Sequence, residues 1–204
     1  MADAIMPVSE SSFSTMGESA PELDLVLRRP VVLIGMMGAG KTAVGRALAS
    51  RLRVPMRDSD AEIVASAQLS IAEIFERYGE PFFREKETQV IERLLKGPPC
   101  ILSTGGGAWM AERNRALLTG QAAVLWLEAD LELLWSRVRN KTTRPLLRTD
   151  DPRRTLEEIL TERTPVYSLA PLKVHVEPGW TISQTAGRVL RRLIEAGAVA
   201  EDAR

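Results

Sequence analysis

The chain has 204 residues, of which 45% are hydrophobic, and its 27 basic and 27 acidic side chains give a formal net charge of zero. A chain of this length buries one sizeable core, so we expect a single domain. The balanced charge excludes a strong overall attraction to nucleic acid or to membrane surfaces, and any affinity for anions must therefore be local.

Residues 1–28 mix Ser, Pro, Glu and Met and have neither the basic start nor the apolar stretch of a signal peptide. We interpret them as a flexible N-terminal leader, followed by a globular domain over residues 29–198 and a C-terminal tail over residues 199–204. No uncharged apolar run reaches about 18 residues, so we expect no transmembrane helix. The single cysteine, Cys100, opens a short apolar run and is expected to be a buried, reduced thiol. Together these features predict a cytoplasmic protein.

Beyond Pro30, short apolar runs alternate with longer segments that carry apolar residues at helical spacing. This alternation is typical of βαβ units, and it predicts an α/β fold with a mostly parallel sheet. The strand candidates are residues 31–35, 54–57, 100–104, 122–128 and 172–176.

Two helices are predicted between the second and third strand candidates. Ser70-Ile-Ala-Glu73 has the spacing of a capping box, and Gly79 is placed to end the short helix that follows. A longer helix is expected over about residues 80–96. Further along, the stretch from Arg137 to Pro152 is basic and poorly periodic, so we expect a mobile loop there.

The strongest functional signal is a phosphate-binding loop that follows the first strand candidate and opens a helix. Its sequence is Gly35-Met-Met-Gly-Ala-Gly-Lys41-Thr42. In such a loop the backbone N–H groups surround phosphate oxygens at a helix N-terminus, a Lys reaches the β- and γ-phosphates, and a Ser or Thr hydroxyl ligates Mg²⁺. We therefore expect ATP with Mg²⁺ here, and the nucleotide-binding residues are Gly38, Ala39, Gly40, Lys41, Thr42 and Ala43.

A second interpretation of the same residues is a dinucleotide-binding oxidoreductase. Gly38-x-Gly40-x-x-Ala43 satisfies a relaxed dinucleotide fingerprint, and Asp58 and Asp60 follow about 20 residues later, where a ribose-binding acid is expected. This interpretation does not explain Lys41, because a cation within the turn suits a triphosphate with Mg²⁺ and is unnecessary for a pyrophosphate. A switch GTPase is disfavoured because Asn140-Lys141-Thr142-Thr143 fails the guanine-binding motif at its last position. A nucleotide-binding module without catalytic activity is a further alternative.

Asp58-Ser-Asp60 stands at the end of the second strand candidate, which faces the ligand crevice in an open parallel sheet. One carboxylate could hold the water shell of the metal and the other could accept a hydrogen bond from a substrate hydroxyl. The alternative is that Asp58 or Ser59 caps the next helix, and both roles are compatible. No apolar run closes on the usual second metal-site acid of P-loop ATPases, so Asp58 is the candidate to complete the metal site with Thr42.

A triple glycine, Gly105-Gly106-Gly107, follows the third strand candidate, and its position suggests that backbone approaches a ligand there, although a plain turn is the simpler explanation. Three arginines could supply anion binding. They are Arg84 after two phenylalanines, Arg163 before Thr164-Pro165, and Arg144 within the predicted loop. Each could equally be a solvated surface cation.

Taken together, these motifs resemble those of the shikimate kinase family, in its order and spacing, over about residues 30–196. The motifs are Gly35 to Thr42, Asp58-Ser-Asp60, Phe83-Arg84, Thr104-Gly-Gly-Gly107, Arg144-Pro-Leu-Leu147 and Arg163-x-Pro-x-Tyr167. The resemblance implies a three-layer αβα fold of the P-loop, nucleoside monophosphate kinase-like type, with a five-stranded parallel sheet and a mobile lid over about residues 138–152. It also implies transfer of the ATP γ-phosphoryl group to the 3-hydroxyl of shikimate.

The resemblance further implies individual roles. Lys41, Asp60 and Arg144 would be catalytic, with Asp60 activating the hydroxyl and Arg144 closing over ATP, while Thr42 and Asp58 would serve the metal. Shikimate would be bound by Asp60, Arg84, Gly105, Gly106, Gly107 and Arg163, and Arg137 would lie against the adenine. After Tyr167 the chain lacks the acidic residues of many members, so no role is transferred there. A gluconate-type sugar-acid kinase is the nearest alternative, and we expect a monomer.

Overall fold

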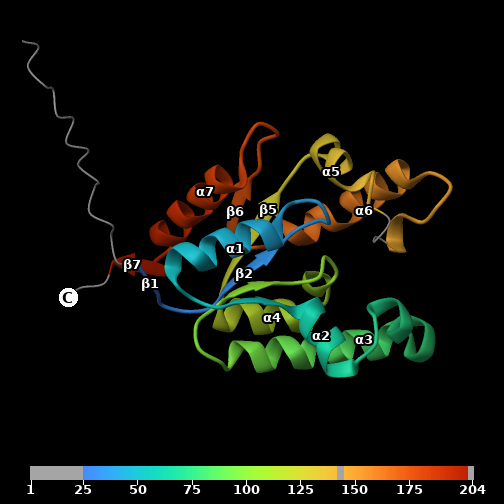
Figure 1. Cartoon of the computed structure of the whole chain (residues 1–204), viewed down its shortest axis with the longest axis horizontal. Coiled ribbons are helices and arrows are strands. Elements are labelled where there is room, and N and C mark those ends of the chain that lie inside the picture. The colour runs from blue at the N-terminus through green and yellow to red at the C-terminus, as the bar shows by residue number, and fades with distance from the viewer. Residues whose placement is uncertain (1–24, 142–144, 202–204) are drawn as a thin grey trace, which may run out of the picture.

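The computed structural model describes residues 25–141 and 145–201, and its centre is a five-stranded parallel sheet (Figure 1). The strands are β2 Val31–Ile34, β3 Met56–Asp58, β4 Ile101–Ser103, β5 Ala123–Glu128 and β6 Leu172–His175, in the order β3-β4-β2-β5-β6. Each strand lies within a predicted range or one residue beyond it. The α/β fold class and the five-stranded parallel sheet are therefore confirmed.

Helices cover both faces of this sheet and make three layers (Figure 1). The helices are α1 Lys41–Leu52, α2 Ser59–Ala67, α3 Ile71–Leu95, α4 Glu112–Gln121, α5 Leu131–Val138, α6 Pro152–Tyr167 and α7 Ile182–Glu195, with short 3₁₀ turns η1 Ala108–Met110 and η2 Pro145–Leu147. Helices α1 and α7 lie side by side over one face, and α4 packs on the other next to α3. None of the helices in the described ranges is both long and apolar enough to cross a bilayer.

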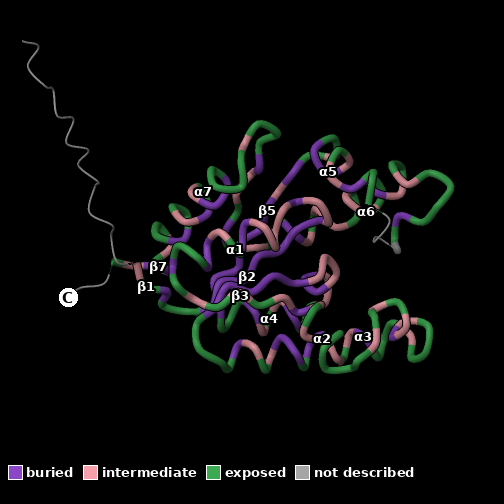
Figure 2. Tube along the Cα trace, in the orientation of Figure 1, coloured by how far each residue is buried: buried purple, intermediate pink, exposed green. Residues whose placement is uncertain are grey.

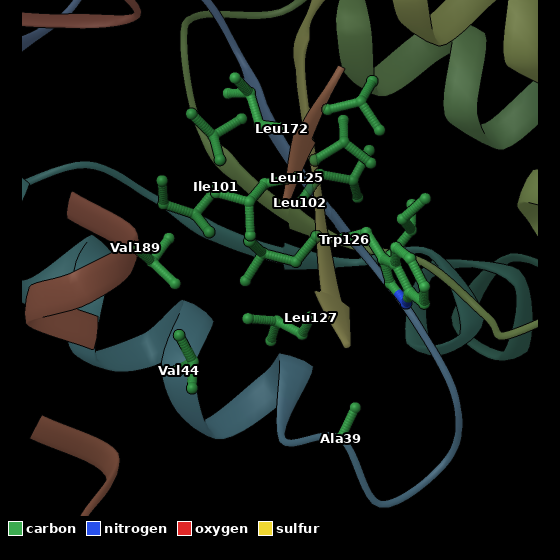
Figure 3. Packing of buried hydrophobic residues seen from close by; sticks show 14 of the residues in the cluster. Ala39, Val44, Ile101, Leu102, Leu125, Trp126, Leu127, Leu172 and Val189 are labelled. Carbon is green, nitrogen blue, oxygen red and sulfur yellow. The ribbon is translucent and has the colours of Figure 1, made fainter. Parts of the chain in front are cut away.

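The main core lies between the central strands and the flanking helices. Figure 3 shows Val44 of α1 and Val189 of α7 facing the strand side chains, among them Ile101 and Leu127, and these residues are almost fully buried. The central strands are buried along their length, whereas the outer surfaces of the helices are exposed (Figure 2). Strands covered on both faces are mostly apolar, which is why they stood out as apolar runs in the sequence.

Helix α3 is divided at Gly79, whose φ of 78° and ψ of 173° are not helical. The predicted capping box is present at its start, where Ser70 and Glu73 exchange side chain to backbone hydrogen bonds. The short helix ended by Gly79 and the longer helix after it are thus confirmed. The two helical segments, together with α2, bury a second small cluster made of Ile63, Ile74, Phe83 and Val90.

The predicted ends of the domain were wrong. Strand β1, Leu25–Leu27, pairs antiparallel with β7, Val199–Glu201, so residues assigned to the leader and to the tail belong to the folded domain. Strands of only three residues carry too little periodicity to be recognised in a sequence. In addition, β1 and β7 pair with each other from opposite ends of the domain, so no local pattern connects them. Residues 1–24 and 202–204 lie outside the described residues.

Candidate active site

The predicted phosphate-binding loop connects β2 to α1 and has the expected turn. Gly38 and Gly40 have φ values of 86° and 100°, in the left-handed region that favours glycine. The Lys41 ammonium folds back into the loop, where Nζ donates to the carbonyl oxygens of Gly35 at 2.8 Å and Met36 at 3.1 Å. A fixed cation at the N-terminus of a helix, beside N–H groups that have no partner within the helix, makes a strong site for phosphate groups.

Thr42 and Asp58 lie together beside this loop. The Thr42 hydroxyl Oγ1 lies 3.3 Å from Asp58 Oδ2, while Asp58 Oδ1 accepts hydrogen bonds from the backbone N–H groups of Asp60 and Ala61. One carboxylate oxygen therefore caps α2, which confirms the capping interpretation of Asp58. The other oxygen faces Thr42, and the role of Asp58 at the metal stays a prediction. Within residues 25–141 and 145–201 no group of three or more His, Cys, Asp or Glu side chains could form a metal cage. Two hard oxygen ligands suit Mg²⁺, which completes its shell with water and substrate phosphates.

The triple glycine after β4 is the point at which the predicted substrate residues meet. An added Cβ would lie 2.7 Å from Asp60 Oδ1 at Gly105, 3.1 Å from Arg163 Nη1 at Gly106, and 2.6 Å from both terminal nitrogens of Arg84 at Gly107. Each glycine is thus approached closely by one of the three side chains, and side chains at the first and third positions would collide with them. At Gly106 the same atom would lie 3.6 Å from the Gly35 carbonyl oxygen, so the turn adjoins the phosphate-binding loop.

Two aromatic side chains that were not assigned a role hold this turn against α6. Tyr167 donates its hydroxyl hydrogen to the Gly106 carbonyl oxygen at 2.5 Å, and Trp109 Nε1 donates to the Val166 carbonyl oxygen at 2.8 Å. Burial raises the pKa of the Tyr167 hydroxyl, with the nearby Arg163 acting in the opposite direction. Trp109 belongs to none of the motifs identified in the sequence, and nothing in the sequence pattern revealed its hydrogen bond.

Glu87 is a site residue that the sequence analysis missed. Its Oε2 accepts a hydrogen bond from Arg84 Nη1 at 3.0 Å, while Arg84 Nε and Nη2 donate to Glu80 at 3.1 and 3.0 Å. The Glu87 side chain is only 1% exposed, and burial raises its pKa to about 7, with Arg84 opposing the rise and Asp60 adding to it. Glu87 follows Arg84 by three residues on a predicted helix, and residues at this spacing lie on the same helix face. This spacing was the one sequence signal that the two side chains could pair. The site therefore contains a carboxyl group that titrates close to neutral pH.

The titration of Glu87 predicts a specific loss of stability with rising pH. In the unfolded chain this carboxyl titrates near 4.5, so between that value and about 7 the folded protein holds a proton that the unfolded chain has released. The unfolding free energy therefore falls as pH rises through this window, by roughly 3 kcal/mol at most, and the effect is flat above it. Glu87→Gln, which is neutral throughout, should lack this fall.

Urea unfolding of the wild type and of Glu87→Gln at pH 5 and pH 8 measures this difference. The exposed Glu85 on the same helix gives the matched control, because Glu85→Gln should keep the wild-type pH dependence. Parallel pH dependences of the wild type and Glu87→Gln would contradict a raised pKa for Glu87.

The remaining predicted residues are Arg137 and Arg144. Arg137 Nη1 donates to the carbonyl oxygens of Gly38 at 3.1 Å and Ala39 at 3.3 Å, which places it directly against the phosphate-binding loop. Burial lowers the pKa of Arg137 from its usual value. Arg144 lies outside the described residues, as do its two preceding neighbours in the predicted lid, so its role stays a prediction.

The order of the strands argues against the dinucleotide-binding interpretation. In a dinucleotide-binding fold the ribose-binding acid ends the strand adjacent to the one that carries the glycine loop. Here Asp58 ends β3, and β4 lies between β3 and the loop-bearing strand β2. Asp58 instead accepts a hydrogen bond from the Thr42 hydroxyl, and these are the two residues predicted to serve the metal.

Comparisons with known proteins agree with this geometry. The sequence profile of the family described as Shikimate kinase matches residues 37–193. The chain is 59% identical over 167 residues to a shikimate kinase of Cereibacter sphaeroides, covering 82% of this chain and 83% of that protein. It is 58% identical over 167 residues to a shikimate kinase of Ruegeria pomeroyi, covering 82% and 86%. The solved structure of shikimate kinase from Acinetobacter baumannii in complex with shikimate superposes with a TM-score of 0.78 at 34% identity, covering 82% of this chain and 94% of that chain.

Proposed function

Because the chain belongs to the shikimate kinase family, we propose that it transfers the γ-phosphoryl group of ATP to the 3-hydroxyl of shikimate, giving 3-phosphoshikimate and ADP. One observation carries the proposal. The turn Gly105–Gly107 is approached by the carboxylate of Asp60 and by the guanidinium groups of Arg163 and Arg84, and it adjoins the phosphate-binding loop. A hydroxyl-activating group and two carboxylate-binding groups therefore lie next to the phosphate site.

Arg84 and Arg163 bind the shikimate carboxylate in this proposal. Guanidinium groups form paired hydrogen bonds with a planar carboxylate, which gives the contact both strength and direction. Arg84 is held by Glu87 and Glu80, so its guanidinium is oriented before the substrate arrives. The pKa of Glu87 is near 7, so the negative charge of a substrate carboxylate bound at Arg84 favours the protonated form of Glu87. The charge of Arg84 then interacts with the substrate rather than with Glu87.

Lys41 and the loop N–H groups bind the phosphates of ATP. Thr42 and Asp58 would hold Mg²⁺, whose charge neutralises the phosphate oxygens when it is bound. Arg137 would border the adenine, and Arg144, in a lid over about residues 138–152, would complete the site over the phosphates. Positioning and charge stabilisation supply most of the acceleration in phosphoryl transfer, so these roles fit the reaction.

Asp60 orients the attacking hydroxyl and accepts its proton. Its position at the start of α2, with Oδ1 close to Gly105, fixes the carboxylate relative to the turn that holds the substrate. The hydroxyl then faces the γ-phosphorus in line with the leaving oxygen, and Lys41 stabilises the charge on the transferred group. We further propose that the protein acts in the cytoplasm as a monomer. The buried, unpaired thiol of Cys100 is compatible with a reducing compartment.

A coupled ADP-release assay tests the proposed reaction. The protein is supplied with ATP and Mg²⁺ and with either shikimate or gluconate at matched concentrations. Shikimate-dependent release of ADP is the expected result. Release with gluconate alone would overturn the substrate assignment and keep the kinase, while NAD(P)H binding without ADP release from either substrate would favour the oxidoreductase alternative.

A further inference from the structure

We propose that Thr88 and Asn114 are positioning residues that set the place of Arg84 relative to the triple-glycine turn, and so help to determine affinity for shikimate. The inference rests on the proposed role of Arg84 in binding the substrate carboxylate. Thr88 lies one helical turn after Arg84 on α3, and Asn114 lies on α4. Neither residue belongs to a motif singled out in the sequence.

A short chain of hydrogen bonds joins the two sides of the site. Thr88 Oγ1 lies 2.7 Å from Asn114 Oδ1, and Asn114 Nδ2 donates to the Ala108 carbonyl oxygen at 3.0 Å. Ala108 directly follows Gly107, and its N–H donates to the Gly105 carbonyl oxygen at 3.1 Å. The connection thus runs from the Arg84 helix, through the Asn114 side chain, to the turn that the Arg84 guanidinium touches.

The direction of each hydrogen bond in this chain is fixed. If the Asn114 amide were reversed, its oxygen would face the Ala108 carbonyl oxygen, and two acceptors would oppose each other. The amide nitrogen therefore faces Ala108, and the amide oxygen faces Thr88. Because that oxygen can only accept, the Thr88 hydroxyl donates its single hydrogen to Asn114, although the Arg84 carbonyl oxygen also lies 3.0 Å away.

Burial makes this chain costly to break. Thr88 is 5% exposed and Asn114 is 1% exposed, so water cannot readily replace a lost partner. A buried polar group without a partner is strongly unfavourable, and the protein therefore keeps the one arrangement that satisfies all three groups. That arrangement specifies the distance between α3 and the turn.

The apolar contacts of α3 do not specify this distance as sharply. Beyond the site, Ile91 and Leu95 of α3 belong to the main core, whereas Phe83 and Val90 belong to the separate small cluster with α2. Apolar burial is not directional, so these contacts tolerate small shifts of the helix along its axis. Hydrogen bonds have narrow ranges of distance and angle, and the Thr88 to Asn114 bond removes that freedom.

A shift of α3 would act on the substrate site through Arg84. The terminal nitrogens of Arg84 approach Gly107 so closely that a single added carbon would collide with them. In the proposed site the guanidinium groups of Arg84 and Arg163 bind one carboxylate together. Binding of this kind is sensitive to displacements of about 1 Å. Loosening the helix should therefore weaken shikimate binding. It should leave ATP binding unaffected, because the phosphate-binding loop joins β2 to α1 and makes no part of α3.

Thr88→Val tests the inference, because valine keeps the shape and removes the hydroxyl. We expect the KM for shikimate to rise about tenfold, with the KM for ATP within about twofold of the wild type. Thr88→Ser restores the hydroxyl and should recover most of the shikimate KM. Thr185→Val is the matched control, because Thr185 is a buried threonine of α7, away from the site. Its hydroxyl donates to the carbonyl oxygen of Thr181, the residue that caps the N-terminus of α7.

Asn114→Leu supplies an independent variant, and the two changes should not add when combined, since both break the same connection. Thermal melting of every variant identifies assay temperatures at which all are folded. At such temperatures a purely structural role would lower the melting temperature and leave both KM values unchanged, so that result for Thr88→Val would overturn the inference. Equal rises in both KM values, or a failure of Thr88→Ser to recover the shikimate KM, would also overturn it.

Arg84→Ala, assayed in parallel, separates the inference from the proposal on which it rests. If Arg84→Ala raises the shikimate KM and Thr88→Val does not, the positioning role is wrong and the carboxylate site stands. If Arg84→Ala leaves the shikimate KM unchanged, the carboxylate site itself is wrong, and the inference is overturned with it.

Discussion

Replacement of Lys41 with methionine is expected to lower kcat by about three orders of magnitude and to change the affinity for shikimate by less than about twofold. The unbranched methionine side chain has nearly the length of lysine and carries no charge. Lys41 Nζ lies within 2.8 and 3.1 Å of two loop carbonyl oxygens, and from that position it can reach bound phosphates. The lost interaction is one that strengthens as charge spreads over the transferred group.

Steady-state kinetics and equilibrium binding of shikimate measure the two quantities separately. Lys96→Met is a suitable control, since that lysine is 69% exposed at the end of α3 and pairs only with its helical neighbour Glu92 among the described ion pairs. Its kcat should equal that of the wild type. A Lys41→Met enzyme whose kcat stays within tenfold of the wild type would remove Lys41 from the catalytic group.

The elements that could be predicted are those whose signals are local. Each central strand is covered on both faces and is therefore mostly apolar, which made β2, β4 and β5 visible as short apolar runs. The phosphate-binding loop and the capping box at Ser70 depend on fixed spacings within a few residues, and Gly79 ended a helix because its conformation suits glycine. Structures that depend on the conformation and hydrogen bonding of a few neighbouring residues can therefore be predicted from a single sequence.

The elements that could not be predicted depend on contacts between distant segments. The pairing of β1 with β7 joins the two ends of the domain and has no local pattern. The triple glycine indicated that something approaches the backbone, but the assignment of Asp60, Arg163 and Arg84 to one glycine each required the tertiary structure. Glu87 is ordinary in sequence and becomes unusual only because folding buries it beside Arg84.

Asp60→Asn is the second change with a large expected effect. Asparagine has the same shape, so it fits beside Gly105, where the carboxylate oxygen would lie 2.7 Å from an added Cβ. It cannot take a proton from the substrate hydroxyl, and loss of a positioned general base typically costs about 10²–10⁴ in rate. We therefore expect kcat to fall by that amount, with the KM for ATP close to the wild-type value.

Asp60→Glu tests whether the carboxylate must be correctly placed to accept the proton or whether a negative charge in the site is enough. It keeps the carboxylate but adds a methylene group, and the close approach of Gly105 leaves no room for the longer side chain to place its oxygens as aspartate does. We expect Asp60→Glu to be about as slow as Asp60→Asn, and Asp130→Asn, an exposed aspartate at the start of α5, to be fully active. Near-normal turnover by Asp60→Asn would show that the hydroxyl needs no base, and near-normal turnover by Asp60→Glu alone would show that only the charge matters.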